Sequence, residues 1–134
     1  MKRKFHIANI VAAFVGLVTL FAHAQDKPAA TLAATEKPKH TTAEIMKVLH
    51  KGNDSLGKKV QNGQGTKEDF AKLVEFYTSL PLNEPPEGGA ASWKEKSTAV
   101  LEAAKALNDG KEGAVAQYKK AINCKACHDV HRVQ

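Results

Sequence analysis

Hydrophobic residues recur at helical spacing in four segments of the chain, and no segment shows the alternation typical of a β-strand. The first segment begins at Thr41, with Glu44 three residues later as in a capping box, and it extends to about Asn62. Gly63 and Gly65 are expected to end this helix. Its apolar stripe consists of Ile45, Met46, Leu49, Leu56 and Val60.

Two further segments show the same spacing. The second begins at Thr66, carries Asp69 in its first turn and ends at Pro81. A loop rich in proline and glycine follows it. The third segment begins at Ser92, and Glu95 stands three residues later, which predicts another capping box.

The fourth segment extends from about Glu112 to about Val130. Four amphipathic helices must bury their apolar stripes against one another, and short loops make successive helices antiparallel. The pattern therefore predicts an all-α domain over residues 41–134, folded as an antiparallel four-helix bundle. In such a bundle the N-terminal half of the first helix lies beside the C-terminal half of the fourth.

The N-terminus has the features of a secretory signal peptide. Basic residues 2–4 precede an apolar run at residues 10–21, and Ala22-His23-Ala24 forms a small-x-small cleavage pattern. We expect residues 1–24 to be cleaved off during export. The mature protein is then expected to be periplasmic or otherwise exported. Residues 25–40, rich in Ala, Thr and Pro, are expected to form a flexible leader. The apolar run is shorter than the roughly 18 to 20 residues that cross a bilayer, so no stable membrane span is expected.

The length and net charge of the chain limit the classes of function that it fits. With 134 residues the chain fits one modest domain and excludes a large multidomain enzyme. Loss of the signal peptide takes away three basic residues and no acidic one, so the formal charge falls from +6 to +3. This mild excess, without a recognisable motif, does not indicate nucleic-acid binding. It is compatible with docking to acidic redox partner proteins.

Both cysteines lie in the pentapeptide Cys124-Lys125-Ala126-Cys127-His128, and C-x-x-C-H is the attachment signal for c-type haem. On a helix Cys124, Cys127 and His128 project in neighbouring directions, because residues three and four apart share a face. The two thiols would form thioethers with the porphyrin vinyl groups, and the imidazole of His128 would be the proximal iron ligand. The cofactor expected is one covalent haem c with its iron.

The cysteines have two other interpretations, a zinc site and a dithiol or disulfide pair. A structural zinc site normally has four ligands, and no second cysteine pair completes one with His128. A disulfide or a thioredoxin-type pair between Cys124 and Cys127 suits an exported protein, but the thioredoxin-type pair belongs to a βαβ context that the helical pattern lacks.

A helical bundle with C-x-x-C-H near its C-terminus resembles the class II cytochromes c, the family of cytochrome c-prime and its low-spin, methionine-ligated relatives. The resemblance covers roughly residues 41–132. In that family the motif is commonly followed by two residues, then an aromatic and then a basic residue. Here His131 stands at the aromatic position, and Arg132 matches the basic one and is expected near the haem. Relatives occur as monomers and as dimers, so the resemblance leaves a homodimer open.

The sixth iron position has few candidates. His131 lies on the same side of the porphyrin as His128 and is expected at the haem edge or facing solvent, and His40 lies in the leader. Met46 and His50 remain, both in the N-terminal half of the first helix. At about 100° per residue Met46 lies about 50° from the centre of the apolar stripe and His50 about 90° from it. The resemblance also favours Met46, and a site without a sixth protein ligand stays open.

The expected function depends on that position. Ligation by His128 and Met46 predicts a one-electron carrier with no catalytic acid, base or nucleophile, hence not an enzyme. An open distal face instead predicts a five-coordinate, cytochrome c-prime-like protein that binds NO or CO.

Overall fold

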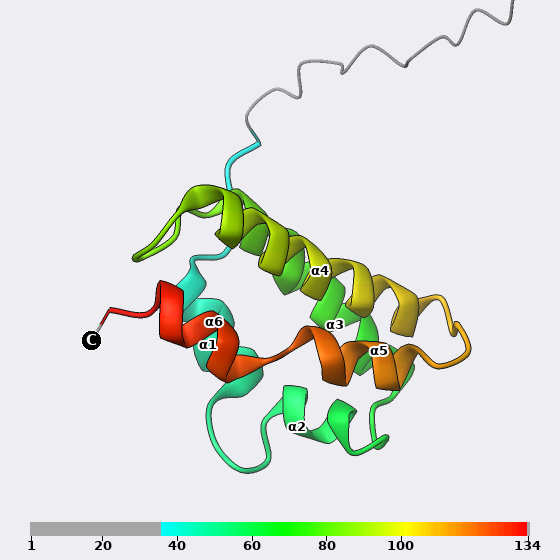
Figure 1. Cartoon of the computed structure of the whole chain (residues 1–134). Helices are drawn as coiled ribbons and strands as arrows, with labels where there is room; N and C mark the ends of the chain where they lie inside the picture. Colours follow the sequence, from blue (N-terminus) through cyan, green and yellow to red (C-terminus); the bar gives the residue numbers. More distant parts are fainter. Residues whose placement is uncertain (1–35, 134) are drawn as a thin grey trace, which may run out of the picture. The chain divides into compact units, whose positions relative to one another are not determined.

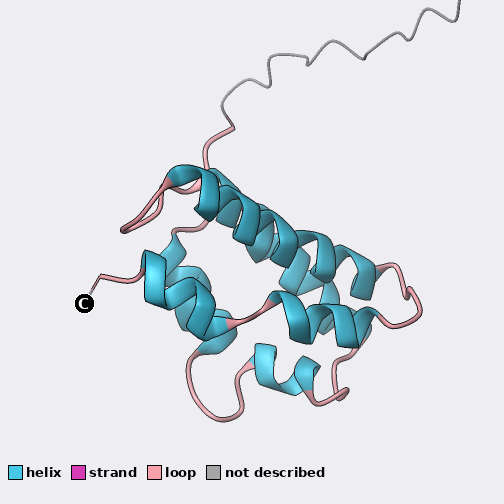
Figure 2. Ribbon diagram, viewed as in Figure 1, coloured by secondary structure: helices cyan, strands magenta, loops and turns pink. Residues whose placement is uncertain are grey.

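Within residues 36–133, every regular element of the computed structural model is a helix (Figure 1; Figure 2). The structure describes residues 36–133, so the predicted signal peptide and most of the predicted leader lie outside the described residues. No strand occurs in residues 36–133, and the predicted all-α class is confirmed for that range. None of the helices in this range is long and apolar enough to span a membrane. The elements are α1 (Thr42–His50), α2 (Leu56–Gln61), α3 (Lys67–Thr78), the 3-10 turn η1 (Leu80–Leu82), α4 (Ala90–Asn108), α5 (Ala114–Ala121) and α6 (Cys124–His131).

The first predicted helix is broken, so its expected continuity over residues 41–62 was wrong. Helix α1 ends at His50, and α2 begins at Leu56. Between them Gly52 adopts a left-handed conformation with φ of 91°, which ends a right-handed helix at little cost because glycine has no Cβ. Ser55, with an extended backbone, is the N-cap of α2.

The fourth predicted helix is broken as well. Helix α5 ends at Ala121, and Ile122 leaves the helical region with φ of −82° and ψ of 52°. Asn123 then starts α6 as its N-cap, since its side-chain Oδ1 accepts a hydrogen bond from the backbone N–H of Ala126 at 3.1 Å. The break therefore falls directly before the C-x-x-C-H motif.

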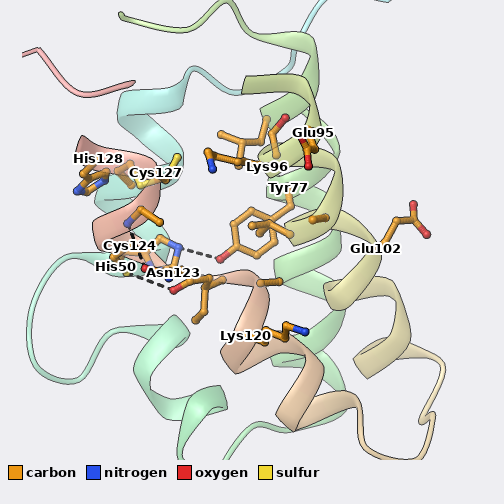
Figure 3. A pocket seen from close by; sticks show the side chains of 18 of the residues that line it. His50, Tyr77, Glu95, Lys96, Glu102, Lys120, Asn123, Cys124, Cys127 and His128 are labelled. Atoms are coloured by element: carbon orange, nitrogen blue, oxygen red, sulfur yellow. Dashed lines mark hydrogen bonds between the residues drawn. The ribbon is translucent and has the colours of Figure 1, made fainter. Parts of the chain in front are cut away.

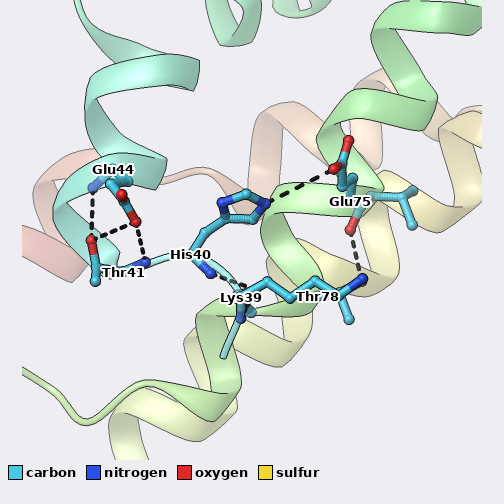
Figure 4. A network of polar contacts seen from close by, with 8 residues as sticks. Lys39, His40, Thr41, Glu44, Glu75 and Thr78 are labelled. Atoms are coloured by element: carbon cyan, nitrogen blue, oxygen red, sulfur yellow. Dashed lines mark hydrogen bonds and ion pairs between the residues drawn. The ribbon is translucent and has the colours of Figure 1, made fainter. Parts of the chain in front are cut away.

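The capping box predicted at Thr41 is confirmed, and the structure has a second one, at Thr66, where only a helix start was predicted. At α1 the Glu44 carboxylate accepts from the Thr41 N–H at 2.8 Å, and the Thr41 hydroxyl accepts from the Glu44 N–H at 3.3 Å (Figure 4). Thr66 and Asp69 make the same reciprocal pair at α3. Lys59 on α2 also donates to Asp69 at 2.7 Å, so this N-terminus is tied to the preceding helix.

The capping box predicted at Ser92 and Glu95 was wrong. Helix α4 begins at Ala90 with Gly89 as its N-cap, two residues before the predicted start. Ser92 and Glu95 consequently lie inside the helix, so Ser92 does not occupy the N-cap position that a capping box requires.

Helix α4 is the long central element, and it packs against α3, η1, α5 and α6. Its inner face carries the small residues Ala103, Ala104 and Ala106, which allow close approach of neighbouring helices. Aromatic and aliphatic side chains from the other helices complete the core. Those with the largest fully buried side chains are Tyr77, Tyr118, Ile45, Leu49, Leu73 and Val60.

The residues just before α1 contact the helical domain. The backbone N–H groups of Lys39 and His40 both donate to the Ser79 hydroxyl, at 3.1 and 3.2 Å. The His40 ring stacks on Phe76 with centroids 4.1 Å apart, and its Nε2 lies 3.9 Å from the Glu75 carboxylate (Figure 4). The C-terminal end of the predicted leader is thus held against α3.

Candidate functional site

Helix α6 presents the C-x-x-C-H residues over its first five positions. Cys124 is exposed, Cys127 is half-buried, and both thiols are free. The side chain of His128 is one residue further on, in the second turn of the same short helix. The two thiols and the imidazole are therefore available from one helix, with no disulfide joining Cys124 to Cys127.

The motif borders a cavity of about 660 Å³, most of whose wall is apolar (Figure 3). A volume of this size is in the range of cofactor and ligand sites. Helices α1, α3, α4, α5 and α6 all contribute to its wall. The lining residues are Met46, His50, Tyr77, Leu80, Glu95, Lys96, Ser97, Ala99, Val100, Glu102, Gln117, Lys120, Ala121, Ile122, Asn123, Cys124, Ala126, Cys127 and His128.

The cavity brings together four residues that the sequence predicts as a site. Cys124, Cys127 and His128 lie on α6, whereas Met46 lies on α1, nearly eighty positions earlier in the chain. Met46 is half-buried and packs against the hydrophobic core. His50 lines the same cavity one helical turn further along α1, so the shape of the cavity does not by itself choose between the two.

A buried polar chain distinguishes His50 from Met46. The Nε2 atom of His50 lies 2.7 Å from the Tyr77 hydroxyl, and that hydroxyl lies 3.0 Å from the hydroxyl of Tyr118. Both tyrosines are fully buried. Sequence patterns indicate only helical core positions for them, because the contacts join residues 27 and 41 positions apart.

The protonation of this chain follows from its burial. Burial raises the pKa of Tyr118 to about 12 and the pKa of Tyr77 well above 10, so both phenols keep their protons near neutral pH. Burial, and secondarily the charge of His128, lowers the pKa of His50, so its imidazole is neutral there. Every hydroxyl proton finds an acceptor when Tyr118 donates to Tyr77 and Tyr77 donates to His50 Nε2.

Burial keeps the Cys127 thiol protonated. It raises the pKa of this thiol, and the opposing effect of the Lys96 ammonium, which extends toward it in Figure 3, is smaller. The attacking cysteine of a redox pair instead has a lowered pKa, because the thiolate is the nucleophile, so Cys127 does not fit that role.

The zinc alternative also gains no support from the geometry. Within residues 36–133 no three His, Cys, Asp or Glu side chains converge as a metal-ligand group. A structural zinc site requires such convergence, with four ligands around one ion. Haem attachment does not, because the thiols bond to the macrocycle and the imidazole alone reaches the iron.

His131 does not face solvent, which was one of its two predicted placements, and it does not line the cavity. His131 is 2% exposed, its Nδ1 lies 2.8 Å from the Glu87 carbonyl oxygen, and its Nε2 lies 3.2 Å from the Ser92 hydroxyl. The ring also meets Trp93 edge-on at 5.4 Å. Because the carbonyl only accepts, Nδ1 carries the proton and Nε2 accepts from Ser92. His131 therefore attaches the end of α6 to α4 and to the loop before it.

Two other candidate residues lie away from the cavity wall. Arg132 is exposed at the C-cap of α6, where its backbone N–H donates to the His128 carbonyl at 3.2 Å. His40 packs on Phe76. Neither lines the cavity that Met46 and the C-x-x-C-H residues share.

Comparison of the chain with protein-family models, with curated protein sequences and with solved structures finds no match. The cofactor that fits this chain is therefore inferred from the side chains that border the cavity. Two free thiols and an imidazole stand at the edge of a large apolar cavity, and this combination fits a covalently attached haem. A thioether sulfur, that of Met46, lines the same cavity as a further candidate iron ligand.

Proposed function

We propose that this chain is an exported monohaem c-type cytochrome that carries single electrons between redox partner proteins. The observation that carries the proposal is the common cavity of Cys124, Cys127, His128 and Met46. Three of these residues come from the haem-attachment motif and the fourth from a distant helix. They supply the two attachment points and the two axial ligands that a low-spin c-type haem uses.

The same proposal includes a four-helix bundle in which two arms are interrupted. Helices α1 and α2 form the first arm, α3 the second, α4 the third, and α5 with α6 the fourth. The contacts between α3 and α4, α4 and α5, and α2 and α5 support this arrangement. Membership of the class II cytochrome c family, in which such a bundle encloses the haem, is part of the proposal.

Each residue of the site has a defined role. The thiols of Cys124 and Cys127 would hold the haem covalently, as thioethers to its vinyl groups. His128 and Met46 would hold its iron. When bound, the haem supplies the reversible one-electron chemistry of its iron.

The rest of the cavity determines the environment of the haem. Its wall is mostly apolar, and the apolar surroundings of a haem together with the identity of the iron ligands tune the reduction potential. A histidine–methionine pair gives a higher potential than two histidines. Electron transfer of this kind requires no catalytic acid, base or nucleophile. Lys120, which is exposed on α5 and lines the cavity with Cys124, provides positive charge near the motif for an acidic partner.

Maturation of the full chain in a host that exports it and attaches haem tests the proposal. We expect haem to stay with the chain on a denaturing gel and to be lost when Cys124 and Cys127 are both replaced by Ala. The oxidised protein should be low-spin, with the weak absorption in the red that marks thioether ligation of ferric haem. Met46→Ala should abolish that band, whereas Leu80→Ala, which trims another side chain of the same cavity, should keep it.

Two results would contradict parts of the proposal. A chain without covalent haem after such maturation would refute it entirely. A high-spin wild-type spectrum that Met46→Ala leaves unchanged, together with CO binding to the reduced protein, would instead support a five-coordinate, gas-binding haem protein.

A further inference from the structure

We infer that Tyr77 is a positioning residue that keeps His50 from binding the haem iron and so leaves the sixth position to Met46. This inference rests on the proposed function. His50 and Met46 lie one helical turn apart on α1, and both line the cavity that His128 borders. Imidazole is a strong iron ligand, so a contact that restrains the His50 imidazole decides which of the two residues binds the iron.

The restraint acts on the lone pair of the imidazole. A neutral imidazole has one nitrogen that carries a proton and one that offers a lone pair, and only the lone pair binds a metal. When Tyr77 donates its hydroxyl proton to His50 Nε2, across the observed 2.7 Å, that lone pair is already used.

In the other tautomer of His50 the free lone pair lies against the backbone of α2. With the proton on Nε2, His50 would donate to the Tyr77 oxygen, and its lone pair would be on Nδ1. That atom faces Gly57, where a Cβ would lie only 2.7 Å from Nδ1 and 2.8 Å from the neighbouring ring carbon. The ring edge is therefore covered by α2, and an iron has no access to it.

Tyr77 is itself held in place. Its side chain is fully buried on α3, and its hydroxyl oxygen lies 3.0 Å from the Tyr118 hydroxyl, which donates to it in the fully paired arrangement. A buried hydroxyl that lost its partner would cost free energy, because no water replaces the bond. The phenol therefore stays directed at His50, and the restraint does not relax.

Tyr77→Phe in the matured protein is the test, with Tyr118→Phe as the matched control. The first removes the hydroxyl that contacts His50, whereas the second removes a neighbouring buried hydroxyl and keeps the contact. We expect Tyr77→Phe to remain low-spin, to lose the red thioether band and to shift to a lower reduction potential as His50 replaces Met46. Tyr118→Phe should keep the band and the wild-type potential.

A double variant separates ligand exchange from general damage. Tyr77→Phe combined with His50→Gln removes the competing imidazole, so the thioether band should return. In the reduced, diamagnetic protein the nitrogen NMR shift of His50 Nε2 should change in Tyr77→Phe and stay unchanged in Tyr118→Phe.

Each contrary result has a distinct meaning. A wild-type protein that carries covalent haem with two histidine ligands, or a Tyr77→Phe variant that keeps the band and potential, would overturn the inference. Failure of the double variant to regain the band would also overturn it, since the loss would then be structural. These outcomes leave the attachment of haem intact, whereas absence of covalent haem in the wild type refutes the proposed function itself.

Discussion

Replacing His131 by alanine should loosen the helix that carries the C-x-x-C-H motif. The side chain is 2% exposed and makes two hydrogen bonds, to the Glu87 carbonyl and the Ser92 hydroxyl, beside an edge-on contact with Trp93. Two neutral hydrogen bonds contribute about 1 to 3 kcal/mol together, and the aromatic contact about 0.5 to 1.5 kcal/mol. Since Glu87 and Ser92 are not fully buried, water replaces part of the lost bonding.

These magnitudes predict a loss of about 2 to 3 kcal/mol in the free energy of unfolding for His131→Ala. That is a large fraction of the about 5 to 15 kcal/mol that stabilises a domain of this size. Urea denaturation measures the global loss, and hydrogen exchange of the α6 amides measures the local one. Exchange in α6 should accelerate more than exchange in α3, because His131 connects α6 to α4 and the loop before it.

Two matched variants show which part of the contact matters. His131→Phe keeps an aromatic ring beside Trp93 but loses both hydrogen bonds, so its loss should lie between wild type and His131→Ala. Val133→Ala, two residues further on and 60% exposed, should change stability by less than about 0.5 kcal/mol. A His131→Ala protein as stable as Val133→Ala, with unchanged exchange in α6, would refute the assigned role of His131.

Three other substitutions have defined expectations. Gly57→Ala should destabilise the protein by about 1 to 3 kcal/mol in urea although alanine favours helix, because the added Cβ would lie 2.7 Å from His50 Nδ1; a more stable variant would contradict this packing. Asp69→Asn removes the ion pair with Lys59 and weakens a capping box, so a loss of about 1 kcal/mol is expected by thermal unfolding, and an unchanged melting temperature would argue against it. Burial lowers the pKa of His50 below 6.5, so the unfolded chain binds the proton more readily, and the free energy of unfolding should fall as pH drops from about 7.5 to about 5. His50→Gln should flatten that dependence, and an equally steep profile in the variant would assign it to other groups.

Local signals in the sequence predict the helical class and two of the helix starts. Thr41 with Glu44 and Thr66 with Asp69 are capping boxes in the structure because both partners lie within one turn. Ser92 with Glu95 has the same spacing but lies inside α4, since a helix N-terminus also needs an extended residue at the cap, and Gly89 supplies it. Spacing alone does not specify that backbone conformation.

The two helix breaks were missed because hydrophobic periodicity continues across them. Leu56 keeps the stripe of the first segment, so the turn residues 52–55, Gly-Asn-Asp-Ser, were absorbed into a helix. Asn is a preferred N-cap residue, so Asn123 between Ile122 and Cys124 was the available sequence signal for the start of α6. In the structure its side chain accepts the capping hydrogen bond from the Ala126 N–H.

The polar contacts around the site could not be predicted from one sequence. His50, Tyr77 and Tyr118 occupy ordinary helical core positions in the pattern, and their chain of hydrogen bonds depends on how three helices meet. The same holds for His131, whose partners lie about forty residues earlier in the chain. Helical spacing tells which side of a helix faces inward, but it carries no information about which residue lies opposite.

The two helix breaks have a common consequence for the site. Each falls beside the cavity: α1, α5 and α6 all line it, whereas α2 contacts α5 and does not line it. An unbroken helix would have kept its apolar stripe facing the same neighbour along its whole length. The left-handed conformation at Gly52 and the N-cap at Asn123 interrupt that continuity. Local backbone chemistry, at a glycine and an asparagine that contribute little to the hydrophobic core, therefore changes the course of the chain just after His50 and just before the C-x-x-C-H motif.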